Sequence, residues 1–378
     1  MLRPHAPAFA SRPILTSSLA LLLAACAGSG GGDPPATSPS PTNPNQNPNQ
    51  NPNQPTAFSR LWVPNYNAGT LRAWTQANTV ADRDNAPDVE ITLPAGTRPN
   101  ALTFEASGAL WVTDNAGNRL LKFGSSQLAA SGSPTPVVVI DSDGASLDAP
   151  IGFAFDGVGN LWVGVAGRIE CYEPDNLDDS GPTTPNRVIT TPGFDLPAGM
   201  AFDGGGNLWV TNASFTAANN SVTVFSPAQQ AAGGAQTPAL TLRSTAFALV
   251  EGIAFDGNGD LWVASNDGLD VARFAASEIA LPALPETRTL APTASLEADI
   301  DDTPSGRTVR KAGGIVFDRD GNLFVNSERG PMGGNDSAVL RFDPTLLGFV
   351  GAMATPASTL ISRSTSNPGF GGLALELP

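Results

Sequence analysis

The sequence predicts an all-β fold, one six-bladed β-propeller of four-stranded antiparallel blades over residues 57–378. Three observations predict it: a repeat of about fifty residues, a tryptophan at one fixed position of that repeat, and two incomplete repeats at the chain ends that complement each other. The composition agrees, because 40 Gly and 34 Pro in 378 residues are typical of many short strands and turns.

Each repeat opens with two apolar runs joined by a turn. The clearest copy pairs Glu251-Gly-Ile-Ala-Phe255 with Leu261-Trp-Val263 across Asp256-Gly-Asn-Gly-Asp260. Gly and Asn tolerate positive φ, so this turn predicts a hairpin, and it is too short for an EF-hand calcium loop. Equivalent pairs of runs occupy 100–104 and 110–112, 151–155 and 161–163, 198–202 and 208–210, and 313–317 and 323–325. The repeated tryptophans are Trp62, Trp111, Trp162, Trp209 and Trp262.

Two further strand-like segments follow each pair, for example 168–172 and 187–189, or 221–225 and 239–242. They complete a four-stranded blade. At the ends of the chain, Arg60-Leu-Trp-Val63 is a second strand with no first strand before it, and Gly371–Glu376 is a first strand with no second strand after it. Pairing these two segments makes the sixth blade and closes the ring without a free sheet edge.

The N-terminal 56 residues predict a secretion and anchoring segment rather than part of the folded domain. Residues 1–25 have a basic start and an apolar stretch too short to span a bilayer, as in a secretion signal. Leu23-Ala-Ala-Cys26 resembles the lipobox of bacterial lipoproteins, which implies that Cys26 is lipidated, and Ala27 favours the outer membrane of the cell envelope. Residues 26–56 would then be the lipidated cysteine and a disordered Gly-, Pro- and Asn-rich linker. Cys171 has no remaining partner and is predicted to be a buried apolar residue.

Charge and composition exclude several classes of function. The formal net charge is −15, which argues against a nucleic-acid partner, since such partners are bound through Lys and Arg. The one histidine, His5, lies in the segment that the signal would lose on cleavage. A chain without histidine cannot use Ser-His-Asp or Cys-His catalysis.

The Gly-Ile-Ala-Phe-Asp, Gly-Asn turn and Leu-Trp-Val pattern resembles NHL repeats and the gluconolactonase-like and streptogramin-lyase propellers. The gluconolactonase resemblance implies metal ligands at the starts of first strands, around the central channel. Here those positions hold Asn100 and Glu251, which could bind Ca²⁺ or Mg²⁺ with water completing the shell. The other equivalents cannot ligate through side chains: Ile151, Ala198, Gly313 and Gly371. The lyase resemblance implies a catalytic histidine, which the cleaved chain would lack.

One face of the ring gathers the second-to-third and fourth-to-first connections, and we call it the upper face. Besides Asn100 and Glu251, its candidate binding residues are Asp114, Asn212, Asn266, Asp301, Asp302 and Arg329. For Asp114 and Asn212 the alternative is that they cap loops through Asx turns. For the acidic pair the alternative is a solvated loop, and for Arg329 a surface ion pair.

Two functions follow as hypotheses, beside the third alternative of a structural spacer without a specific ligand. The first is a monomeric, membrane-tethered lipoprotein whose propeller binds an envelope protein, peptide or glycan without catalysis or a cofactor. The second is a metal-dependent lactonase or hydrolase that uses Glu251 and Asn100 as metal ligands. The absence of histidine and the loss of the other metal positions favour the first.

Overall fold

The computed structural model describes residues 58–80, 86–266, 271–297, 311–329, 336–347, 352–353, 358–362 and 372–377. The signal segment, Cys26 and the linker lie outside these residues. The chain forms two compact units, Met1–Ser40 and Pro41–Pro378, and the propeller lies in the second. Among the described residues no helix has the length and apolar character needed to cross a membrane.

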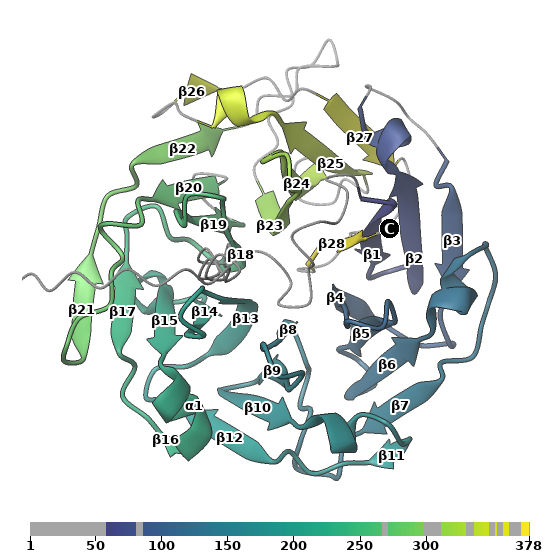
Figure 1. The fold of residues 1–378 in the computed structure, drawn as a ribbon, viewed down its shortest axis with the longest axis horizontal. Coiled ribbons are helices and arrows are strands. Elements are labelled where there is room, and N and C mark those ends of the chain that lie inside the picture. The colour runs from purple at the N-terminus through teal and green to yellow at the C-terminus, as the bar shows by residue number, and fades with distance from the viewer. Residues whose placement is uncertain are drawn as a thin grey trace, which may run out of the picture. The chain divides into compact units, whose positions relative to one another are not determined.

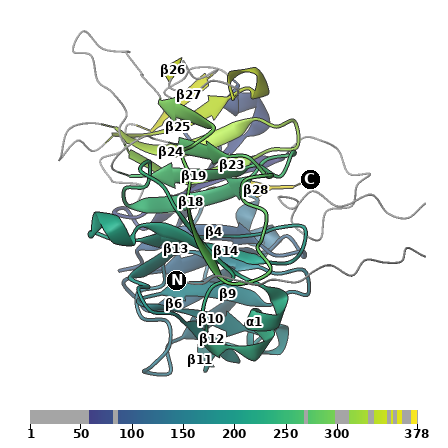
Figure 2. The same cartoon turned by 90° about the vertical axis from the view of Figure 1, so that its left-hand side faces the viewer.

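Six antiparallel sheets stand around a central axis, each with its first strand innermost (Figure 1). This confirms the predicted six-bladed propeller. In the side view, the blades lie next to one another around the ring (Figure 2). The two chain ends share blade 1, in which β28 (Ala374–Glu376) pairs antiparallel with β1 (Arg60–Asn65). The ring is therefore closed by the two ends of the propeller sequence, as predicted.

The strands of the blades follow chain order. Blade 1 continues with β2 (Thr70–Thr75) and β3 (Val89–Thr92), and blade 2 is β4 (Pro99–Phe104), β5 (Leu110–Asp114), β6 (Arg119–Phe123) and β7 (Val138–Asp141). Blade 3 is β8 (Phe153–Phe155), β9 (Leu161–Val165), β10 (Arg168–Tyr172) and β12 (Arg187–Thr190). Blade 4 is β13 (Leu196–Phe202), β14 (Leu208–Ala213), β15 (Ser221–Phe225) and β17 (Leu240–Arg243). Blade 5 is β18 (Val250–Phe255), β19 (Leu261–Ser265), β20 (Val271–Phe274) and β22 (Ala294–Glu297), and blade 6 is β23 (Lys311–Phe317), β24 (Leu323–Arg329), β25 (Asp336–Phe342) and β27 (Ser358–Ser362).

Blades 2 to 5 each carry a fifth strand that the sequence did not predict. It is a short parallel strap, donated by the third-to-fourth connection of the following blade to the outer strand. The straps are β11 (Gly181–Pro182) on β7, β16 (Gly234–Ala235) on β12, β21 (Glu286–Thr289) on β17, and β26 (Ala352–Met353) on β22. At the edge of blade 1, Gly132 makes the same kind of contact with Ile91 as an isolated bridge. The straps join neighbouring blades at their outer edges and satisfy backbone groups that an edge strand would leave open.

Helices occur in the connections. The α-helix is α1 (Pro227–Ala232), which begins after Ser226, whose hydroxyl accepts from the Gln229 N–H in a capping box. Single 3₁₀ turns are η1 (Gln76–Thr79), η2 (Ser125–Leu128), η3 (Pro174–Asn176), η4 (Ala217–Asn219) and η5 (Pro344–Leu346).

The apolar core lies between the blades. Six clusters of buried side chains each combine two neighbouring blades, and the repeated aromatic residues lie at their centres. Trp209, for instance, meets Phe255 of the next blade edge-to-face, with ring centroids 5.4 Å apart. Large side chains of neighbouring blades therefore pack against one another. Cys171 is buried and free, as predicted, and burial raises the pKa of its thiol to about 11 despite a hydrogen bond from Arg187.

Each repeated tryptophan donates its indole N–H to a carboxylate of its own blade, and in blades 2 to 5 that carboxylate lies in the hairpin turn. Trp162 bonds Asp156 at 3.1 Å, and Asp156 also accepts the N–H groups of Val158 and Asn160, so one acid holds both the turn and the ring. The other pairs are Trp111 with Glu105, Trp209 with Asp203, Trp262 with Asp256, and Trp62 with Glu376. Blade 1 thus takes its acid from the opposite end of the chain.

Blade 6 lacks this indole donor, since Phe324 occupies the tryptophan position. Its turn acid, Asp318, is bonded by Asn322 and by the Asp320 N–H, but burial dominates and raises the pKa of the Asp318 carboxyl. In blade 2 burial also raises the pKa of Glu105, but hydrogen bonds from Ser107, Trp111 and Lys122 outweigh it and leave that pKa below its usual value.

Candidate functional site

The first strands approach one another closely around the axis. A Cβ at Gly152, Gly199 or Gly252 would overlap the backbone carbonyl at the start of the next blade's first strand, from Ala198, Glu251 and Gly313 respectively. Glycine is therefore required here by space and not by a positive φ. The Thr211 hydroxyl bridges the same junction, since it accepts the Gly199 N–H at 2.7 Å and donates to the Glu251 carbonyl at 2.7 Å.

The structure places Asn100 and Glu251 in first strands of blades 2 and 5, both about 2% exposed. Asn266 donates its side-chain N–H to Glu251 Oε1 at 2.6 Å, so two of the predicted residues meet. Asn100 Oδ1 is buried and accepts no hydrogen bond from any residue the structure describes.

Asp114 and Asn212 lie at the same position of their blades and perform the same structural task. Asp114 accepts the Arg98 N–H at 2.9 Å and the Gly117 N–H at 3.1 Å, and it forms an ion pair with Arg119. Asn212 accepts the Asp195 N–H at 2.8 Å and donates to the Gly193 carbonyl at 2.9 Å. Both side chains tie the entry of a first strand to the end of the second strand.

For three of the predicted residues, the structure describes no side chain. Asp301 and Asp302 lie outside the described residues. Arg329 ends β24, where its backbone is in register with Asp336 of β25, and its side chain is likewise outside the description.

The described residues do not fit a carboxylate-rich metal site. They include no group of three His, Cys, Asp or Glu side chains placed to hold one ion. The positions between Asn100 and Glu251 around the ring are filled by Ile151 and Ala198, which pack with Leu196 and Ala213 in an apolar cluster. Ca²⁺ requires six to eight oxygens. We therefore assign no metal ion to Asn100 and Glu251.

This apolar cluster borders an open hollow on the upper face, which sequence reasoning missed. The hollow has a volume of about 450 Å³ and lies between the connection leading into β13 and the loop after β14. Its lining residues are Phe194, Asp195, Leu196, Ser214, Phe215 and Thr216. Phe215 is 84% exposed, the highest value among the large apolar side chains that the structure describes.

The loop that carries Phe215, residues 214–220, is held firmly. Buried Asn220 accepts the Ser214 N–H at 3.1 Å and the Val250 N–H at 3.2 Å, and it donates to the Ser214 carbonyl at 2.8 Å. Arg243 donates to the Ala218 carbonyl from the outer side. The exposed ring is therefore presented by a loop that side-chain hydrogen bonds hold at both ends.

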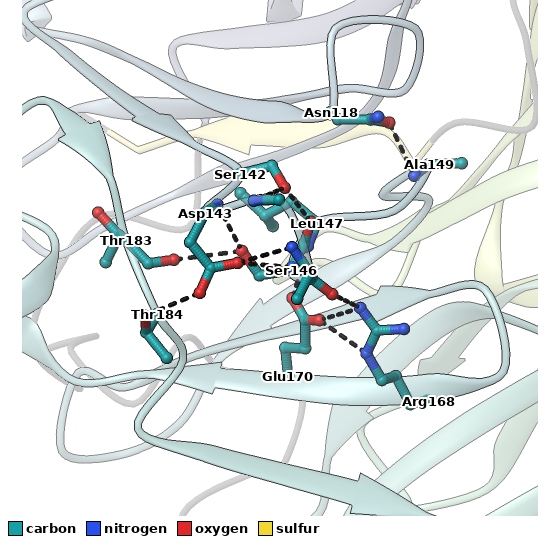
Figure 3. Close-up of polar contacts among 12 residues, drawn as sticks. Asn118, Ser142, Asp143, Ser146, Leu147, Ala149, Arg168, Glu170, Thr183 and Thr184 are labelled. Carbon is teal, nitrogen blue, oxygen red and sulfur yellow. Dashed lines mark hydrogen bonds and ion pairs between the residues drawn. The ribbon is translucent and has the colours of Figure 1, made fainter.

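A second upper-face connection, residues 142–149 in blade 3, is fixed by buried Glu170 (Figure 3). This carboxylate accepts the Leu147 N–H and the Tyr172 hydroxyl, both at 2.9 Å, and forms an ion pair with Arg168. Leu147 has φ 53°, a strained value that these contacts hold in place.

The same network perturbs two ionisable groups. Burial and the neighbouring Glu170 charge raise the pKa of the Tyr172 hydroxyl. Hydrogen bonds from Thr184 and from the Ala145 and Ser146 N–H groups lower the pKa of the Asp143 carboxyl. Because the network joins groups within the chain, we assign it to the rigidity of the upper face.

Comparison with known proteins agrees on the architecture. No protein-family model matches the chain, and no curated protein matches it. Solved structures do match: a chain of the nidogen–laminin complex has 15% sequence identity, covers 84% of this chain and 98% of its own, and has a TM-score of 0.52. The likeness is one of fold. A Bacteroides caccae protein of unknown function has 12% identity, coverage of 82% and 100%, and a TM-score of 0.51. Streptogramin B lyase has 15% identity, coverage of 84% and 87%, and a TM-score of 0.48.

Proposed function

We propose that this propeller is a non-catalytic binding module whose upper-face hollow receives an apolar group of an envelope partner. The observation that carries the proposal is Phe215, an 84% exposed aromatic side chain on a loop held by Asn220 beside a hollow of mixed apolar and polar lining. Aromatic residues on preorganised surfaces are typical anchors of interfaces, because little conformational entropy is lost when they become buried.

Placing a photo-crosslinking phenylalanine analogue at position 215 tests this. We expect cross-links from position 215 to a discrete partner in envelope preparations. Leu284 is a matched control, since it is 77% exposed and lies in the third-to-fourth connection of blade 5, away from the hollow. The same analogue at position 284 should give no such product. Equal cross-linking from both positions, or none from position 215, would refute the proposal.

We also propose that lipidated Cys26 and the Pro- and Asn-rich linker tether the module to a bacterial membrane, with the outer membrane favoured. The lipobox-like Leu23-Ala-Ala-Cys26 supports this. The Cys26→Ser variant should leave the detergent phase and lose incorporation of labelled fatty acid, whereas the Cys171→Ser variant should retain both. A Cys26→Ser chain that still incorporates the label would contradict the tether.

A further inference from the structure

The lining of the hollow contains one ionisable side chain, Asp195. Two carboxylates near the upper face form ion pairs, Asp114 with Arg119 and Glu170 with Arg168, whereas Asp195 is exposed to solvent. Among the described residues no Lys or Arg forms an ion pair with Asp195, and its carboxylate accepts only a long 3.4 Å hydrogen bond from Asn219. The hollow therefore combines apolar walls with a carboxylate that has no cation.

The position of Asp195 is fixed by its backbone. Its N–H donates to Asn212 Oδ1 at 2.8 Å, and its carbonyl accepts the Gly167 N–H at 3.0 Å. A charged group held in place beside an apolar anchor contributes mainly to the selection of partners by charge.

The hollow is lined by three apolar side chains and three polar ones, Asp195, Ser214 and Thr216. The Ser214 hydroxyl is turned toward its own loop, where it accepts the Thr216 N–H at 3.0 Å. Phe194 is packed edge-on against Phe225 and forms an apolar wall. The apolar part of this lining suits an apolar side chain, and Asp195 is the charged group beside it.

We infer, resting on the proposed function, that the hollow binds a polypeptide segment in which an apolar residue stands next to a lysine or arginine. The apolar side chain packs against Phe215 and Leu196, and the cation meets Asp195. The net charge of −15 favours encounter with such a basic segment over an acidic one.

Three acetylated and amidated peptides test the inference: Gly-Gly-Phe-Arg-Gly-Gly, Gly-Gly-Phe-Glu-Gly-Gly and Gly-Gly-Ser-Arg-Gly-Gly. The protein is the full chain carrying Cys26→Ser, with binding measured by titration calorimetry at low and high salt. We expect the Phe-Arg peptide to bind most tightly. Asp195→Asn should weaken that binding about tenfold at low salt and remove the preference over the Phe-Glu peptide.

The outcomes separate this inference from the function on which it rests. No measurable peptide binding, no preference for Phe-Arg, or a preference that survives Asp195→Asn would overturn the inference alone. So would a partner that proves to be a glycan, captured through position 215. If Phe215→Ser leaves the binding of every ligand unchanged, the proposed function fails as well.

Discussion

Removing residues 374–378, which include the last strand β28 (Ala374–Glu376), should abolish the cooperative unfolding of the propeller. The three pairs that close the ring are Arg60 with Glu376, Leu61 with Leu375, and Trp62 with Ala374. Without them β1 becomes an open edge, and the fully buried Trp62 loses the acceptor of its indole N–H. We expect a broad, non-cooperative urea transition when tryptophan fluorescence is followed.

A single substitution separates the side-chain contribution from that of the strand. Glu376→Ala leaves β28 in place but removes the acceptor of Trp62 and the ion pair with Arg60, and it should cost about 1–3 kcal/mol of the free energy of unfolding. Glu286→Ala is the control, since that acid forms an exposed ion pair with Arg288 and should leave the free energy of unfolding close to that of the wild type. Equal effects of the two substitutions would contradict the role assigned to Glu376.

The second large effect is expected at the inner strands. Gly152→Ala places a Cβ onto the backbone carbonyl of Ala198, where both strands are fixed by the closed ring. Because neither backbone can move without disturbing the next blade, we expect a loss of about 3 kcal/mol or more in the free energy of unfolding. Urea titration of the purified chain measures it.

Gly132 provides the matched control. It lies in the connection that contacts β3 from outside, and a Cβ there meets no atom within 4 Å. Gly132→Ala should leave stability within about 0.5 kcal/mol of the wild type. If both alanine variants unfold at the same denaturant concentration, close packing of the first strands is not what requires glycine in the repeat.

The fold was predictable because every blade of a propeller repeats the same pattern of strands, turns and core residues. Apolar periodicity, the hairpin turns and the fixed tryptophan all recur, so the repeat length and the complementary chain ends determine six blades and their closure. The straps were not predicted, since each pairs only a few residues with a strand of another blade. A signal existed in Ser131-Gly132, Ser180-Gly181 and Gly233-Gly234, which recur just before the fourth strands.

The candidate site was predictable only in part. Strand order placed Asn100, Glu251 and Asp114 near the upper face, and Asp114 caps its own loop as the Asx-turn alternative expected. The sequence could not show that Glu251 bonds Asn266. The hollow beside Phe215 belongs to a loop with no counterpart of the same length in the other described blades. A repeat pattern cannot predict such a feature. Asn220 holds this loop partly through a hydrogen bond from the Val250 N–H, a contact between residues far apart in the sequence.

The most direct test of the binding proposal is the affinity of the full chain for the partner cross-linked at position 215, compared across three proteins. They are the wild type, Phe215→Ser and Leu284→Ser. Both substitutions remove an exposed apolar side chain, so thermal unfolding should coincide for all three. We expect Phe215→Ser to lose at least about tenfold in affinity and Leu284→Ser to bind as the wild type does. Wild-type affinity in Phe215→Ser, or an equal loss in both variants, would contradict the assignment of this hollow as the binding site.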